Sequence, residues 1–125
     1  MTSFAGVNIV DVEEEAADYG RWLILGAPGS GKSSLASTVA TMGKTLFIDL
    51  PGEKGTQSFK NAPYAKNIDV VRPESVTALD DIFWSLDKGG HGYKAVIIDS
   101  LTALQKMTMR YLTGFSETAV REIKP

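Results

Sequence analysis

One octapeptide near the start of the chain limits the possible folds more than any other feature. Residues 26–33 read GAPGSGKS and match the pattern G-x-x-x-x-G-K-[ST] at every fixed position. Its glycines allow a tight turn whose backbone N–H groups converge on an anion. The pattern predicts a phosphate-binding loop that lies between a strand and the start of a helix.

Two side chains in this loop add chemistry that the backbone cannot supply. The ammonium group of Lys32 can reach the outer phosphates of a bound polyphosphate as a point charge. The hydroxyl group of Ser33 can ligate Mg²⁺. The helix that starts here brings its positive dipole end to the same place. The loop is therefore expected to hold a phosphate chain together with a magnesium ion.

Short apolar runs alternate along the chain with longer segments of helical length. The RWLIL run, residues 21–25, has the composition of a strand buried on both faces. Further strands are expected at 45–50, 68–71 and 94–99, and helices at 31–42, 75–87 and 101–112. This alternation predicts an α/β fold, a P-loop NTPase with a parallel sheet and crossover helices.

A second acidic residue is needed to hold the magnesium, and two aspartates end apolar strands. Asp49 follows the strand TLFI, and Asp99 follows AVII. The unbroken apolar run before Asp99 is typical of a central strand, whose carboxyl end would lie near the phosphate loop. Asp99 is therefore the preferred partner of Ser33. Small-molecule kinases remain an alternative, because some of them carry the acidic residue on an early strand, where Asp49 would lie.

The order of these segments resembles the core of the RecA-like ATPases. The resemblance covers residues 21 to about 104, and the run KAVIIDSLTAL supports it most strongly after the loop itself. The loop GAPGSGKSSLA is most similar to that of phage-encoded RecA-like ATPases (AAA family ATPases) that act in single-strand annealing and DNA recombination. The resemblance implies ATP and Mg²⁺ as cofactors, single-stranded DNA as a partner and assembly into a ring or filament.

The resemblance also implies a role for each matching residue. Catalytic roles fall to Lys32, Asp99 and Glu53, and Mg²⁺ would be held by Ser33 and Asp99. ATP would be bound by a continuous stretch of the chain, namely Gly26, Ala27, Pro28, Gly29, Ser30, Gly31, Lys32, Ser33 and Ser34.

The sequence departs from the RecA-like pattern in two places. The family's water-polarising glutamate corresponds to Pro51, and the nearest glutamate is Glu53. Either Glu53 takes over this task, or the chain is a nucleotide-gated assembly protein that does not hydrolyse ATP. The family's polar sensor strand, which lies between the loop strand and the strand ending at Asp99, has no counterpart. We therefore expect the N-terminal part of a longer RecA-like core, with a gap in its sheet beside the site.

Composition excludes several other classes of protein. The chain lacks cysteine and has one histidine, which rules out disulfides and a cysteine or histidine zinc site. No apolar run approaches the ~20 residues that cross a bilayer, and a signal peptide is not apparent, so a cytoplasmic location is expected. Residues 1–20 carry five acidic and no basic residues and are predicted to form an acidic arm, separate from the NTPase domain at 21–125.

Overall fold

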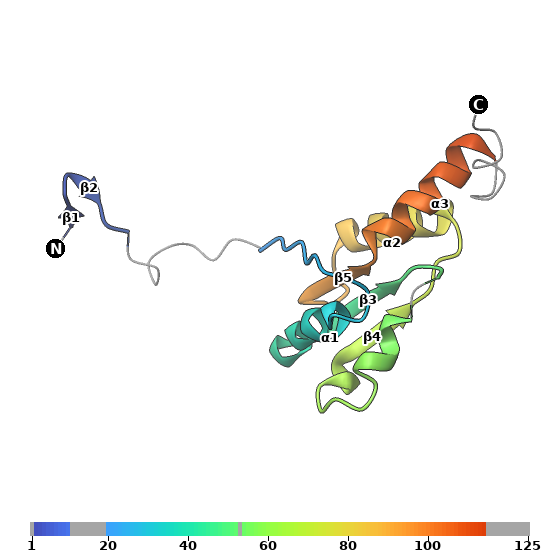
Figure 1. The fold of residues 1–125 in the computed structure, drawn as a ribbon, viewed down its shortest axis with the longest axis horizontal. Coiled ribbons are helices and arrows are strands. Elements are labelled where there is room, and N and C mark those ends of the chain that lie inside the picture. The colour runs from blue at the N-terminus through green and yellow to red at the C-terminus, as the bar shows by residue number, and fades with distance from the viewer. Residues whose placement is uncertain (1, 11–19, 53, 115–125) are drawn as a thin grey trace.

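Three parallel strands form the sheet that carries the site (Figure 1). The computed structural model describes residues 2–10, 20–52 and 54–114. The strands are β3 (Thr45–Asp49), β4 (Ile68–Val71) and β5 (Ala95–Asp99), and their order is β4-β3-β5. All five residues of β3 are buried, as expected for a strand with neighbours on both sides. The predicted parallel α/β sheet is thus confirmed.

The two faces of β3 are covered by different elements, because successive side chains of a strand point to opposite sides. Leu46, Ile48 and Leu50 pack against α2 (Val76–Lys88) and α3 (Leu101–Thr113). On the other face, the Phe47 ring contacts the Phe59 ring, with their centroids 5.0 Å apart. Asp49 belongs by this alternation to the Phe47 face.

The helices of the Leu46 face begin where the sequence predicts them. Ser75 caps α2 by accepting a hydrogen bond from the Ala78 N–H at 3.1 Å, and Ser100 caps α3 by accepting one from the Ala103 N–H at 3.3 Å. Ser100 directly follows β5, and Ser75 lies shortly after the end of β4. The capping serines therefore fix the points at which the chain turns from the sheet into a helix.

The Phe47 face is covered by shorter helical pieces. The helix predicted for residues 31–42 consists of α1 (Lys32–Ser37) followed by the 3₁₀ helix η1 (Thr38–Met42), so its second half is wound more tightly than expected. Two further 3₁₀ turns, η2 (Gly55–Ser58) and η3 (Ala65–Asn67), lie in the long connection between β3 and β4.

The prediction of a buried strand at Arg21–Leu25 is wrong. These residues pair with no strand among the described residues, and the side chains of Trp22 and Leu25 are 90% and 82% exposed. A strand needs a hydrogen-bonded neighbour, and in the described part of the chain the sheet ends at β5. The β5 side chains Val96 and Ile98 are accordingly exposed rather than buried.

The start of the chain forms a small antiparallel hairpin of β1 (Ser3–Phe4) and β2 (Val7–Asn8). This hairpin is not hydrogen-bonded to the three-stranded sheet (Figure 1). All five acidic residues of the predicted arm fall within residues 11–19, which lie outside the described residues. Within the described ranges, no helix has the length and apolar character of a membrane span.

Candidate functional site

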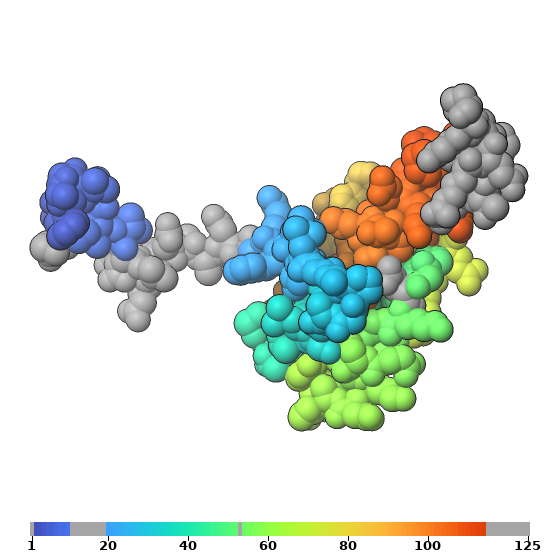
Figure 2. All heavy atoms as spheres, in the orientation of Figure 1, coloured from blue at the N-terminus to red at the C-terminus, as the bar shows by residue number. Residues whose placement is uncertain are grey.

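The phosphate loop lies on the surface, directly before α1. Figure 2 shows it in cyan, between the teal α1 and the orange start of α3. Residues 26–31 are exposed, whereas Lys32, Ser33 and Ser34 are half-buried. Gly29 and Gly31 have φ angles of 77° and 91°, which residues with a side chain rarely adopt. The two glycines therefore produce the turn from which α1 starts.

The side chain of Lys32 folds back over this loop. Its Nζ donates hydrogen bonds to the carbonyl oxygens of Gly26 at 2.6 Å and Ala27 at 3.2 Å. The first N–H groups of a helix have no acceptor within that helix, so those of Lys32, Ser33 and Ser34 can donate to an anion. The ammonium group of Lys32 and the N–H groups at the start of α1 are therefore both available to an anion at this loop.

The structure brings Ser33 and Asp99 together, although 65 other residues separate them in the sequence. Ser33 Oγ donates a hydrogen bond of 2.9 Å to Asp99 Oδ2. Asp99 is the last residue of β5, and the carboxyl end of this strand faces the first turn of α1. The neighbouring arrangement of loop serine and strand-end aspartate agrees with the pairing expected from the sequence.

Both side chains of this pair offer oxygen atoms, the type of ligand that Mg²⁺ prefers. Octahedral Mg²⁺ with bonds of about 2.1 Å places neighbouring ligand oxygens about 3 Å apart, close to the separation of the Ser33 and Asp99 oxygens. Among the described residues, no group of three or more histidine, cysteine, aspartate and glutamate residues gathers to hold a metal. Mg²⁺ at nucleotide sites is usually held by substrate phosphates and by one or two protein carboxylates.

Asp49, the less favoured of the two strand-end aspartates, lies directly beside this pair. It is the register partner of Asp99 on the adjacent strand β3. Its Oδ2 accepts a hydrogen bond of 2.9 Å from Arg72 Nε, and its side chain is only 5% exposed. Asp49 is buried in this ion pair, whereas the Arg72 side chain is 64% exposed. The pair was missed from the sequence, because it depends on the pairing of β3 with β4, which brings Arg72 opposite Asp49.

A backbone segment closes over the Ser33–Asp99 pair. Gly55, the first residue of η2, lies so near that a Cβ atom on it would overlap Asp99 Oδ2 and come within 2.6 Å of Ser33 Oγ. Arg72 also reaches this segment, since its second guanidinium nitrogen lies 3.5 Å from Thr56 Oγ1. A glycine is therefore needed at position 55 for η2 to approach the site as it does.

The variant Gly55→Ala is expected to weaken magnesium-dependent nucleotide binding about tenfold. The added methyl group cannot be accommodated unless Ser33, Asp99 or η2 moves, and each of these shifts disturbs the oxygen pair. Calorimetric titration with a non-hydrolysable ATP analogue and Mg²⁺ measures the effect. Gln57→Ala, an exposed position of the same 3₁₀ turn, is the control and should bind as the wild type does. Equal affinities for the two variants would contradict the close approach of Gly55.

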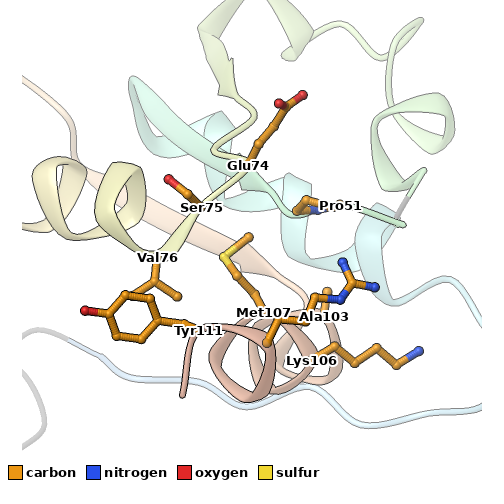
Figure 3. Close-up of a pocket in the computed structure, with 9 residues that line it drawn as sticks. Pro51, Glu74, Ser75, Val76, Ala103, Lys106, Met107 and Tyr111 are labelled. Carbon is orange, nitrogen blue, oxygen red and sulfur yellow. The ribbon is translucent and has the colours of Figure 1, made fainter. Parts of the chain in front are cut away.

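Two positions bear on the group that would orient the attacking water, and the structure describes only one of them. Glu53 lies outside the described residues. Pro51 lines a cavity of about 290 Å³ beside α2 and α3 (Figure 3), and neither Ser33 nor Asp99 belongs to its lining. Met107 occupies the middle of this lining, while the charged ends of Glu74 and Lys106 point outward (Figure 3). Two basic residues, Lys106 and Arg110, line this cavity beside its apolar residues.

A separate polar cluster at the opposite end of the sheet connects β4 to the residues that precede β3 and β5. Asp69 of β4 accepts a hydrogen bond from the Tyr93 hydroxyl at 2.7 Å and forms an ion pair of 3.3 Å with Lys44. The Tyr93 hydrogen bond, followed by the interactions with Lys44, lowers the pKa of Asp69. Asp69 and Lys44 are thus charged residues that lie away from the loop, which makes them suitable control positions.

Comparison with known proteins agrees with this arrangement. A family model described as an AAA domain matches residues 19–122, which include the loop, the whole sheet and α3. No curated protein and no solved structure matches the chain. The matched region covers most of the sequence, and its fold is the α/β core described above. The chain therefore belongs to the AAA domain family of P-loop proteins.

Proposed function

We propose that the chain binds ATP with Mg²⁺ at residues 26–34 and Asp99 and hydrolyses the bound ATP. The observation that carries this proposal is the hydrogen bond of 2.9 Å between Ser33 and Asp99, next to a loop over which Lys32 is already folded. Membership of the AAA domain family supports nucleotide binding. The resemblance to phage RecA-like ATPases supports a role in DNA recombination or single-strand annealing, with single-stranded DNA and further copies of the chain as partners.

Each part of the site has a task in this reaction. The loop N–H groups and Lys32 bind the triphosphate, and Lys32 exchanges its bonds to the Gly26 and Ala27 carbonyls for bonds to phosphate oxygens. Ser33 and Asp99 would hold Mg²⁺, which supplies charge neutralisation at the β- and γ-phosphates. Phosphoryl transfer needs mainly such positioning and charge stabilisation, together with a group that orients the attacking water. We assign this last task to Glu53.

Phosphate release from ATP, with and without single-stranded DNA, tests hydrolysis. We expect turnover that single-stranded DNA stimulates, and a loss of about 100-fold in Glu53→Gln if this residue orients the water. Glu74→Gln, an exposed glutamate after β4, is the matched control. Transfer of phosphate from ATP to a nucleoside acceptor would instead indicate a small-molecule kinase.

The presence of Pro51 where RecA-like proteins have glutamate favours a second candidate, a nucleotide-gated assembly protein. In this case ATP binds with Mg²⁺ and changes the oligomeric state without being hydrolysed. Size-exclusion chromatography with light scattering, run with and without ATP and Mg²⁺, distinguishes the two candidates when it is combined with the phosphate assay. Assembly without any phosphate release, in the presence of single-stranded DNA, would support the second candidate and contradict the first.

A further inference from the structure

Asp49 carries a buried oxygen atom for which the described part of the chain offers no hydrogen-bond partner. Oδ2 is used by Arg72, whereas Oδ1 is buried and unpaired. A buried polar atom without a partner destabilises the fold, and most such atoms are satisfied by protein or by ordered water. The unpaired oxygen therefore indicates that something further belongs beside Asp49.

The position of Asp49 shows what this partner could be. Asp49 and Asp99 are register partners on adjacent parallel strands, so their backbones run about 4.8 Å apart and their side chains lie on the same face of the sheet. Asp99 in turn is bonded to Ser33, the proposed magnesium ligand. On the other side of Asp49, Arg72 occupies Oδ2. Asp49 thus lies between Arg72 and the proposed metal site.

We propose that Asp49 is a second acidic residue of the magnesium site and that its Oδ1 accepts a hydrogen bond from a water molecule bound to Mg²⁺. This inference rests on the proposed function, because it requires Mg²⁺ to bind with nucleotide at Ser33 and Asp99. Mg²⁺ keeps several of its waters when it binds to proteins, and carboxylates commonly accept hydrogen bonds from them. Arg72 holds the other oxygen and balances one of the two neighbouring negative charges.

The proposal makes opposite predictions for the two members of the ion pair. The measured quantity is the magnesium coupling, the ratio of the dissociation constant of a non-hydrolysable ATP analogue in EDTA to that in Mg²⁺. Asp49→Asn should lower the coupling about tenfold, because the acceptor charge beside the metal is lost. Arg72→Met should leave the coupling at or above the wild-type value, because it removes a positive charge from the neighbourhood of the cation. The number and affinity of Mn²⁺ ions bound with the nucleotide, measured by electron paramagnetic resonance, give a second readout.

Matched controls separate this inference from a purely structural role of the ion pair. Asp69→Asn removes another ion-paired aspartate of the same sheet and should keep the wild-type coupling. If the Asp49–Arg72 pair serves only to stabilise the fold, both of its variants change the coupling in the same way. A fall in both variants, or no change in Asp49→Asn, overturns the inference. If Asp49→Asn does not fold, Arg72→Met decides alone, and a fall in its coupling is the contradicting result.

Failure of the proposed function gives a different result. A wild-type protein that binds the analogue equally well in EDTA and in Mg²⁺ has no magnesium coupling, and that result overturns both proposals. Wild-type coupling that Asp49→Asn leaves unchanged overturns only the role of Asp49. The same set of titrations therefore distinguishes the two failures.

Discussion

Replacing Lys32 with alanine is expected to weaken the binding of ATP by about 100-fold. Hydrogen bonds to charged groups contribute about 1.5–3 kcal/mol each, and the larger figure corresponds to about two decades in affinity. In the structure Nζ already lies over the loop, held by the Gly26 and Ala27 carbonyls, so little side-chain entropy has to be lost on binding. Fluorescence or calorimetric titration with ATP measures the change.

Two further variants make the Lys32 experiment specific. Lys44→Ala removes a lysine from the opposite end of the sheet, where it pairs with Asp69, and should bind ATP as the wild type does. Lys32→Arg keeps the charge but replaces a compact ammonium with a wide planar group, and should also bind weakly. If Lys32→Ala binds ATP with the affinity of the wild type, Lys32 and its loop do not bind the phosphates of ATP.

Loss of the Ser33–Asp99 pair is expected to abolish most of the gain in affinity that Mg²⁺ provides. Ser33→Ala and Asp99→Asn should each lower the magnesium coupling by about 10- to 100-fold. The double variant should lose little more than the worse single variant, because the two oxygens, 2.9 Å apart, act on the same ion. The affinities in EDTA should change much less than those in Mg²⁺.

A double-mutant cycle of Ser33→Ala and Asp99→Asn measures how far the effects of the two side chains depend on each other. The same cycle with Ser85→Ala and Asp81→Asn serves as a control, because it changes the same residue types at exposed positions of α2. All of its variants should keep the wild-type response to Mg²⁺. Fully additive losses in the Ser33 and Asp99 cycle would mean that these residues act at separate places.

The sequence was sufficient to predict the strands and helices whose signals are local. The apolar run before Asp99 predicts β5, and Ser75 predicts the start of α2. The approach of Ser33 to Asp99 also follows from a general rule, since parallel strands bring their carboxyl ends to one edge, where the loop lies. These features depend on short segments or on a constraint common to all such sheets.

The remaining features depend on pairing that a local pattern does not contain. The RWLIL run has the apolar character of a buried strand, yet a strand also requires a neighbour, and none flanks it among the described residues. The Asp49–Arg72 pair follows only from the register that sets Ile48 opposite Val71. The close approach of Gly55 arises in an irregular connection, for which hydrophobic periodicity gives no information.

Calorimetric titration of the wild-type chain with a non-hydrolysable ATP analogue, in Mg²⁺ and in EDTA, shows whether the loop and the strand end form a magnesium–nucleotide site. We expect one nucleotide bound per chain in Mg²⁺, with an affinity at least tenfold higher than in EDTA, because Ser33 and Asp99 are placed to hold the ion. Absence of binding, or equal affinity under the two conditions, would contradict the assignment of this loop and strand end as a magnesium–nucleotide site.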